Sequence, residues 1–434
     1  MKPKSKEADC EGAREAIRKE LAKMSNKERP VWDVNDVYSL ADLYKDPNLA
    51  EAMLGRVFAI LGIKGAETQD PEWKGRIVFQ GSNIRTKTGV SAVDLFEEVA
   101  NAPASFAAAR TALAVGALKG MDATLRDAEA AYLQALIDAI HRVPTFVELP
   151  REWWPDSWFH DGSARQHPKY VRPHCRLLRA LYGHPEAGAL WEARLNEILG
   201  QEGWQPIGPD APGVHVHPHT GAILVVYVDD ILMVAKRTVA TQLWAALDRN
   251  VKFKDAAEEI GRYLGANYEY SRYDPKQPNA IRTVSIDMDG YATDATARFE
   301  RELLEKDPKA KLTKVTSPHL PPEVAAQLGV SPGLFTSSCS SHVATLLFLY
   351  RVARPDVAVA TQRLCTVVTK WTTIHDLALI RIFSYLRHAG QAKLKGTLSP
   401  DDLNDLVLAA WSDADWAGES EHTQSTGGLW LELT

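Results

Sequence analysis

A chain of 434 residues, 45% hydrophobic and 24% charged, is long enough for about two to four domains and has the composition of a globular protein, not of a disordered or collagen-like one. Lys and Arg number 50 and Asp and Glu 56, so the net charge of −6 excludes a strongly basic protein and leaves nucleic-acid binding to a local basic groove. Four widely spaced cysteines argue against a zinc ribbon and a disulfide framework, and no apolar run predicts a signal peptide or a membrane span.

The first half of the chain alternates helical and strand patterns. Residues 11–27 carry apolar and charged residues at helical spacing and predict an amphipathic helix, and residues 39–62 continue in a helical or mixed pattern. Residues 73–89, WKGRIVFQGSNIRTKTG, predict a strand that ends in a basic loop. Residues 105–120 predict an Ala-rich helix with Gly120 at its C-terminal cap.

The second half predicts a hairpin, helices and two final strands. Residues 176–204 read as a turn followed by an amphipathic helix, and residues 213–236 as three strands joined by turns, the last two forming a hairpin. The pattern is mostly helical from about residue 276, and residues 406–433 indicate two strands. The fold class that we predict is α+β.

Two adjacent carboxylates, Asp229 and Asp230, lie in the apolar run AILVVYVDDILMVAK, where no Lys or Arg occurs before Lys236. At a hairpin tip such carboxylates can bind hard divalent cations, and Asp127 is the best candidate for a third ligand because it ends another apolar-to-polar transition. Converging Asp residues that hold two metal ions are typical of in-line phosphoryl transfer. The alternative is a solvated β-turn that carries two acids.

Several motifs in order carry a family resemblance. Asp127 opens DAEAAYLQALID with an aromatic residue five positions on, YVDD follows at 227–230, and RLLRALYGHPEAGALWEARLNEIL lies between them. The segments WKGRIVFQGSNI, IGRYLGANYEYS, ARPDVAVATQRL and SDADWAGESEHTQSTGG complete the order. Over nearly its whole length the chain resembles the reverse transcriptase of copia-type retrotransposons, a fragment of their Pol polyprotein that runs into the start of the RNase H domain.

The resemblance implies an RNA-directed DNA polymerase that adds dNTPs to a primer 3′-hydroxyl with two Mg²⁺ ions, or Mn²⁺ in their place. Asp127, Asp229 and Asp230 would be the catalytic carboxylates and metal ligands, with Asp230 in a supporting role. The implied partners are an RNA or DNA template with its primer, dNTPs, and the integrase, protease and capsid parts of the polyprotein supplied elsewhere. No membrane is implied, and the location would be intracellular, in cytoplasmic virus-like particles or the nucleus.

Further residues acquire substrate-binding roles from the same resemblance. Tyr132 would lie beneath the incoming sugar and exclude a 2′-hydroxyl, and its alternative is a buried core aromatic. Arg76, with Lys74 nearby, would contact the triphosphate, although Lys74 can equally be an exposed strand charge. Tyr227 would lie against the primer end or the nucleotide, a role that a strand aromatic does not require.

The sequence departs from the family at two places. Glu186 stands where the family has Gln in its nucleotide-binding turn, which adds negative charge near an anionic substrate and puts full activity in doubt. Asp413 matches the first carboxylate of the RNase H domain, but the other carboxylates would lie beyond Thr434, so we expect no RNase H activity from this chain.

The implied architecture is a right-hand polymerase with fingers, palm and thumb, followed by a connection and a truncated RNase H-like segment. We predict an N-terminal helical extension over 1–65, fingers and palm over 66–275, thumb and connection over 276–405, and the RNase H-like segment over 406–434. One rival is a decayed or domesticated remnant that binds nucleic acid without catalysis, and another is an unrelated metal-dependent phosphotransferase.

Two other signals are given structural interpretations. The alternating His215, His217 and His219 could suggest a metal site, but Pro218 disturbs the third ligand, so we favour an ordinary strand. The tryptophans of REWWPDSWF could stack on bases, but we favour an irregular loop that they fasten to the core.

Overall fold

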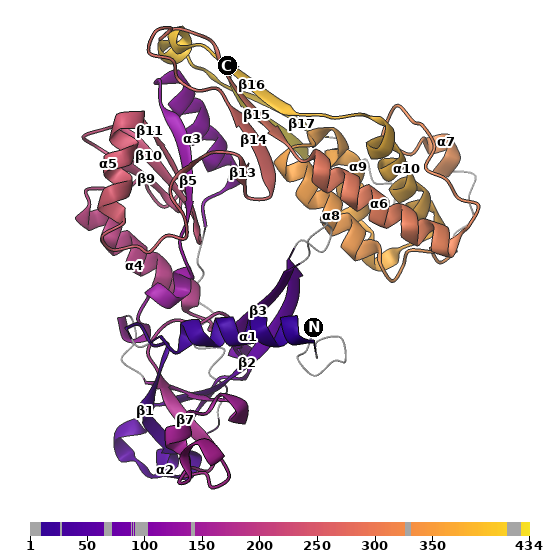
Figure 1. Ribbon diagram of the computed structural model, residues 1–434. Coiled ribbons are helices and arrows are strands. Elements are labelled where there is room, and N and C mark those ends of the chain that lie inside the picture. Colours follow the sequence, from indigo (N-terminus) through magenta and orange to yellow (C-terminus); the bar gives the residue numbers. More distant parts are fainter. Residues whose placement is uncertain are drawn as a thin grey trace.

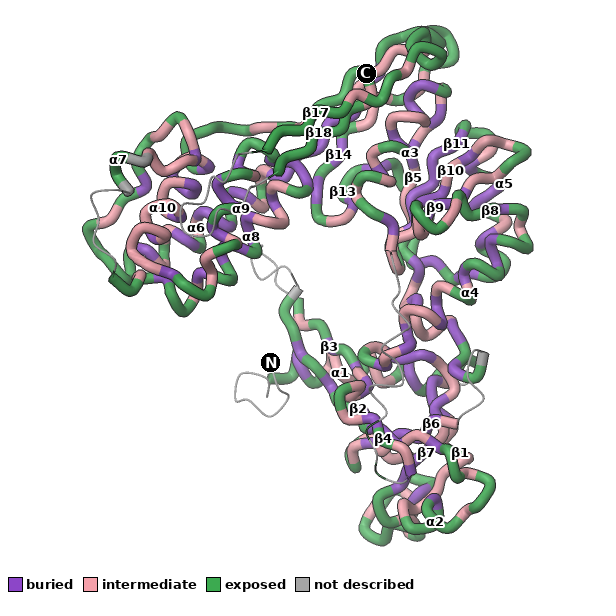
Figure 2. Tube along the Cα trace, turned by 180° about the vertical axis from the view of Figure 1, so that it is seen from behind, coloured by how far each residue is buried: buried purple, intermediate pink, exposed green. Residues whose placement is uncertain are grey.

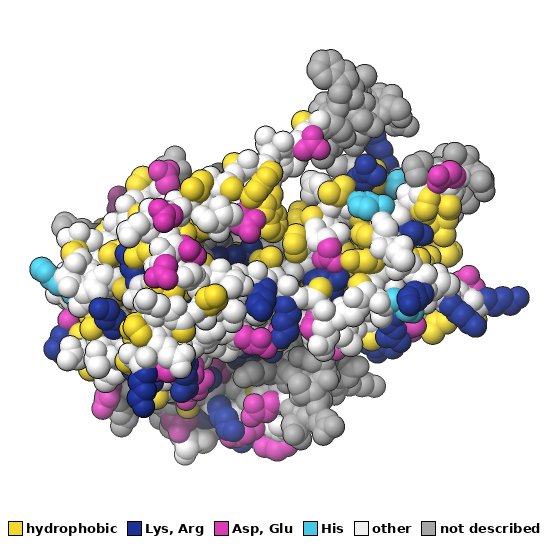
Figure 3. Space-filling model, turned by 90° about the horizontal axis from the view of Figure 1, so that it is seen from above, with side chains coloured by type: hydrophobic (Ala, Val, Ile, Leu, Met, Phe, Trp, Pro, Cys, Tyr) yellow, Lys and Arg dark blue, Asp and Glu magenta, His cyan; other side chains and the backbone are white. Residues whose placement is uncertain are grey.

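The computed structural model describes residues 10–26, 28–64, 72–87, 89, 91, 103–139, 144–325, 331–414 and 427–434. Within these ranges the strands form four β-sheets, so the predicted α+β class is confirmed (Figure 1). In the same ranges no helix has the length and apolar character needed to cross a membrane. Side chains of both charge signs are interspersed over the face seen in Figure 3, as the small net charge leads one to expect.

The first sheet has six strands in the order β1–β7–β6–β2–β3, with β4 paired to β2. Only β2 and β6 pair in parallel among its described strands. Residues of β3 alternate between two faces, so Ile77 and Phe79 are buried in the core while Lys74 and Arg76 are exposed on the opposite face. The strands are β1 (Trp32–Ser39), β2 (Met53–Lys64), β3 (Glu72–Phe79), β4 (Arg85–Thr86), β6 (Thr145–Glu148) and β7 (Pro173–Leu177).

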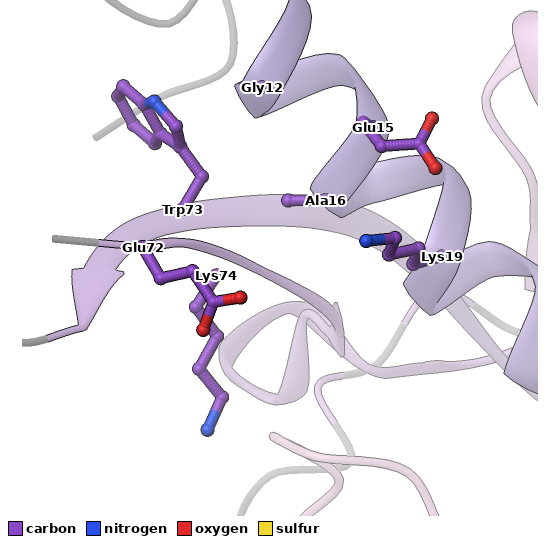
Figure 4. Close-up of a pocket in the computed structure, with 7 residues that line it drawn as sticks. All are labelled: Gly12, Glu15, Ala16, Lys19, Glu72, Trp73 and Lys74. Atoms are coloured by element: carbon purple, nitrogen blue, oxygen red, sulfur yellow. The ribbon is translucent and has the colours of Figure 1, made fainter. Parts of the chain in front are cut away.

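Helix α1 (Glu11–Met24), which the sequence predicts, packs directly on β3. The approach is close, because a Cβ atom at Gly75 would lie 2.7 Å from the main-chain oxygen of Ala16. Figure 4 shows Trp73 on the α1 side of the strand and Lys74 extending from the other side. The helix therefore covers one face of β3 and leaves the basic side chains on the other.

The helical character expected for residues 1–65 is wrong in its second part. Only the short helix α2 (Leu40–Lys45) and a single 3-10 turn (Pro47–Leu49) are helical there, whereas β1 and the 12-residue β2 belong to the first sheet. The second part of β2 pairs with β3, from Val57 opposite Phe79 to Lys64 opposite Glu72. The boundary placed at residue 65 therefore falls between the two paired strands.

The second sheet has the order β12–β5–β11–β10–β9–β8. Helix α3 (Phe106–Leu118) packs on one face, and α4 (Ala187–Gln201) and α5 (Arg237–Leu247) pack on the other. The predicted helix over 105–120, the predicted turn and helix over 176–204 and the predicted three-strand run over 213–236 are confirmed. The strands are β5 (Asp122–Asp127), β8 (Gln205–Pro206), β9 (Val214–His217), β10 (Ala222–Tyr227), β11 (Asp230–Ala235) and β12 (Glu258–Glu259).

Burial on both faces explains the unbroken apolar run of β10 and β11. Leu232 and Val234 pack in the cluster that includes α3, whereas Ile231 and Met233 pack in the cluster that includes α4 and α5. A strand covered on both sides needs apolar residues at every position, not at every second one. The two carboxylates that follow β10 are thus placed where the covered part of the sheet ends.

The segment after residue 260 contains a four-stranded sheet and a helical cluster, and the mostly helical pattern predicted there is confirmed. Phe299 stacks on Phe383 with ring centroids 4.2 Å apart, and Phe335 also packs against the ring of Phe299. The elements are β13 (Arg262–Tyr263), β14 (Ala266–Tyr270), β15 (Arg282–Asp287), β16 (Leu394–Leu398), α6 (Asp289–Lys306), α7 (Pro322–Ala325), α8 (Cys339–Val352), α9 (Ala358–Thr366) and α10 (Thr373–His388).

The last two strands form a separate hairpin, as predicted. β17 (Leu408–Ala414) pairs with β18 (Gly427–Leu433), and Trp411 lies opposite Trp430 in the register. Both strands are exposed along nearly their whole length (Figure 2). Asp413 lies on β17 opposite Gly428, in a sheet that contains neither Asp127 nor the hairpin of Asp229 and Asp230.

The two discounted signals have structural roles. His215 Nε2 is 3.1 Å from Asn196 Oδ1, and His217 packs edge-on against Trp204. In the loop of REWWPDSWF, Trp158 is buried and donates its indole N–H to the Val34 oxygen at 2.8 Å. The interpretation of that loop as fastened to the core is confirmed.

Candidate active site

Three carboxylates meet at one end of the second sheet because of strand register. Asp127 ends β5 and Asp230 begins β11, and the two are paired directly across the antiparallel ladder. The adjacent Ala128 donates its backbone N–H to the Asp229 oxygen at 2.8 Å. The residues that the sequence analysis grouped as metal ligands are therefore brought to the same edge by backbone pairing.

The electrostatics of these carboxylates reflect their proximity. Burial raises the pKa of the Asp230 carboxyl to about 6, and the charges of Asp229 and Asp127 add to the shift. The pKa of Asp127 is raised by burial and then by Asp229, while the cations Lys254 and Lys74 act to lower it. The carboxylates of Asp127, Asp229 and Asp230 therefore repel one another at this edge of the sheet.

The donor set suits a divalent cation in its chemistry but not in the placement of its side chains. Carboxylate oxygens are the ligands that Mg²⁺ prefers, and a cation would relieve the repulsion that raises the two pKa values. Among the residues that the structure describes, no three His, Cys, Asp or Glu side chains are already grouped closely enough to hold a metal ion. Binding a cation here would thus require the carboxylates to draw together.

The turn that presents Asp229 has an unusual backbone. β10 ends at Tyr227 and β11 begins at Asp230, so Val228 and Asp229 form a two-residue hairpin loop. Val228 has a φ of +57°, a conformation that favours glycine and that costs a β-branched residue on the order of 1–3 kcal/mol. Trp191 of α4 donates its indole N–H to the Val228 oxygen at 2.7 Å. Sequence reasoning missed this contact.

Arg76 of the first sheet and two tyrosines outside its strands lie near the acidic edge. Arg76 lies over the ring of Tyr182 at 5.4 Å, and the ring of Tyr182 lies 5.4 Å from that of Tyr132. The pKa of Tyr132 is raised by burial and by the Asp229 charge, and Arg76 acts to lower it. The Tyr132 hydroxyl is therefore within electrostatic reach of both an acid and an arginine.

Tyr182 is a second residue that the sequence analysis did not assign to the site. It is the tyrosine of the Leu-Tyr-Gly turn, and that turn was the only signal that could have identified it. Its ring connects Arg76 of β3 to Tyr132, which lies in the 3-10 turn Ala131–Gln134 after β5. Burial raises its pKa to about 12. It links the basic strand to the acidic sheet.

The remaining predicted substrate-binding residues are placed differently. Tyr227 is half-buried at the end of β10, directly opposite Asp230. Glu186 is 3% exposed at the start of α4, where its backbone N–H donates to His184 Nδ1 at 3.2 Å. The structure therefore brings Lys74, Arg76, Tyr132 and Tyr227 to the acidic edge, buries Glu186, and leaves Asp413 on the separate hairpin.

The chain is thus an α+β protein with an acidic sheet edge faced by basic side chains. No family model matches it. It is 27% identical to the retrovirus-related Pol polyproteins from transposons RE2 and RE1 of Arabidopsis thaliana, in each case over 83% of this chain and 22% of the relative. It is 22% identical to the Pol polyprotein from transposon TNT 1-94 of Nicotiana tabacum, over 94% of this chain and 28% of the relative.

These relatives confirm the resemblance to transposon Pol polyproteins on which the sequence analysis rests. The similarity extends over most of this chain, whereas the chain spans between 22% and 28% of the relatives' length. The chain is thus similar to part of these retrotransposon Pol polyproteins.

Proposed function

We propose that this chain is an RNA-directed DNA polymerase, the reverse transcriptase part of a copia-type Pol polyprotein. The observation that carries the proposal is the strand register that sets Asp127 against Asp230 and ties Ala128 to Asp229. An acidic edge of this kind, facing a strand with Lys74 and Arg76, suits the transfer of a nucleotidyl group from a polyphosphate.

In this proposal the first sheet corresponds to the fingers, the second sheet to the palm, and the helices after β15 to the thumb and connection. β17 and β18, with Asp413, would be the start of an RNase H-like segment. The partners would be a primer annealed to an RNA or DNA template, dNTPs, and the other parts of a retroelement polyprotein.

Each site residue has a role that follows from its chemistry. Asp127 and Asp229 would hold the divalent cations, and Asp230 would support them from the opposite strand. When bound, the ions would activate the primer 3′-hydroxyl and stabilise the charge on the leaving pyrophosphate. The guanidinium of Arg76 would bind phosphate oxygens in two-pronged fashion, with Lys74 as a second cation.

Tyr132 would set the choice of sugar. Its ring packs against Tyr182, so it cannot retreat easily from a 2′-hydroxyl placed above it. Tyr227 would lie beside the primer end. Glu186, which is buried, would act on the turn at the start of α4 and not by direct contact with the nucleotide.

Primer extension on poly(rA) with oligo(dT), Mg²⁺ and dTTP tests the proposal. We expect extension by the unchanged protein and a loss of at least about 100-fold in Asp229→Asn, because a neutral amide lacks the negative charge with which a carboxylate holds the ion. The matched control is Asp210→Asn, which alters an exposed acid in the loop before β9 and should extend normally.

The rival function is a remnant that binds nucleic acid without catalysis. A remnant of this kind would fold and retain primer–template on a filter. It would not extend the primer with either Mg²⁺ or Mn²⁺. That outcome would reject the polymerase assignment.

A further inference from the structure

The hairpin loop of Val228 and Asp229 is held by hydrogen bonds at both of its carbonyls. The Asp229 oxygen accepts from the backbone N–H of Ala128, the neighbour of Asp127. The Val228 oxygen accepts from the indole N–H of Trp191 at 2.7 Å. The first bond belongs to the backbone, so Trp191 supplies the side-chain restraint on this loop.

The loop needs such a restraint because its sequence and its conformation disagree. Two-residue hairpin loops favour turns with positive φ at the first central residue, where glycine is the preferred residue. Here that position is Val228, with a φ of +57°. A valine released from its neighbours would relax toward negative φ, which would turn the following Asp229 away from Asp127.

Trp191 is well placed to prevent that relaxation. Its side chain is 1% exposed and packs with Leu195 and Ile198 of its own helix. The same cluster includes Ala128 and Ala131, which lie between Asp127 and Tyr132 in the sequence. The indole therefore cannot change its orientation without disturbing α4 and the end of β5.

We propose that Trp191 is a positioning residue, whose indole N–H holds the strained Val228–Asp229 turn in the conformation that presents Asp229 to Asp127. The expected effect of Trp191 on catalysis rests on the proposed polymerase function. The expected effect of Trp191 on the conformation of the turn does not depend on that function.

A double-mutant cycle separates this role from ordinary packing. Trp191→Phe removes the N–H donor, and Val228→Gly removes the conflict between residue and φ. We expect Trp191→Phe to lower kcat about tenfold, with KM for dTTP changed less than about twofold. In the Val228→Gly background the same change should cost no more than about threefold, because glycine adopts the turn unaided.

A second readout does not depend on activity. Hydrogen exchange of a peptide covering 122–132 reports the Ala128–Asp229 bond, because Ala128 is its donor. Trp191→Phe should speed exchange of the Ala128 amide with Val228 present and much less with Gly at 228. If the unchanged protein extends no primer, the polymerase proposal fails while the exchange cycle still decides the role of Trp191.

A control variant and a second substitution at position 191 distinguish the loss of the hydrogen bond from a loss of folding. Trp244→Phe removes the same atoms from another buried indole of this sheet, which donates to Thr124 Oγ1 at 3.0 Å. It should leave exchange of the Ala128 amide unchanged. If Trp191→Phe does not fold, benzothienylalanine at position 191 keeps the ring shape without the donor. Equal losses in the Val228 and Gly backgrounds, or unchanged exchange in both, would overturn the proposal.

Discussion

Neutralising Asp230 should stabilise the protein at neutral pH while it removes a carboxylate from the site. The carboxyl pKa of about 6 lies above the ordinary value of 3.8, mainly because of burial and then because of Asp229 and Asp127. At 1.36 kcal/mol per pH unit the difference corresponds to about 3 kcal/mol, and the partial exposure of Asp230 to solvent reduces this to about 1–2 kcal/mol. Asp230→Asn should recover about that amount at pH 7.5.

The pH dependence follows from proton binding. Between about pH 4 and pH 6 the folded protein binds more protons at Asp230 than the unfolded chain does, because the folded pKa is the higher one. The contribution of Asp230 to stability therefore falls as the pH rises through this window, and the cost is complete above it. The gain from Asp230→Asn should be smallest near pH 4 and should grow to its full value by about pH 7.

Urea unfolding of both proteins from pH 4 to pH 8, in EDTA and followed by tryptophan fluorescence, measures this difference. The matched control is Asp413→Asn, which alters an exposed carboxylate on the separate β17–β18 hairpin and leaves the acidic edge unchanged. A variant at Asp230 that is less stable at pH 7.5, or a gain of the same size at every pH, would refute the reasoning.

Three further predictions concern β3 and its neighbours. Arg76→Lys should raise KM for dTTP about tenfold with a smaller effect on kcat, measured by steady-state primer extension, because an ammonium cannot bind phosphate in two-pronged fashion; an unchanged KM would contradict the assignment. Tyr132→Val should increase incorporation of UTP relative to dTTP by at least about tenfold, and unchanged discrimination would argue against its role beneath the sugar. Gly75→Ala should lower stability by about 1–3 kcal/mol in urea unfolding, because its Cβ would lie 2.7 Å from a main-chain oxygen. Gly62→Ala, where a Cβ would meet nothing within 4 Å, is the matched control and should change stability much less.

The strands and helices that positioned the carboxylates were predictable because their patterns are strong. The apolar run from Ala222 to Ala235, interrupted only at the turn, indicates paired strands whichever faces are covered. The helical or mixed pattern over 39–62 was mispredicted because Ala, Leu and Glu favour helices locally, whereas the pairing of β2 with β3 and β6 decides the outcome. Tertiary pairing of that kind leaves no clear local signal.

The carboxylates of the site were predictable from the sequence, but the contacts that hold them in place were not. Asp229 and Asp230 are conspicuous because charge interrupts an apolar run. The restraint from Trp191 joins residues 37 positions apart through one indole hydrogen, and nothing in the periodicity of α4 marks that tryptophan as different from a core residue. The positive φ of Val228 runs against residue preference, so turn chemistry would have placed a glycine there.

The N-terminal helix also belongs to the geometry of the site, although it makes no contact with the carboxylates that the structure records among the described residues. Side chains alternate along a strand, so the close packing of Trp73 and Gly75 against α1 forces Lys74 and Arg76 to the opposite face. The effects of Lys74 on the pKa of Asp127 and of Arg76 on that of Tyr132 place that face toward the acidic edge. Loss of the α1 contact would therefore weaken the proposed nucleotide binding through the orientation of β3, without altering Lys74 or Arg76 themselves.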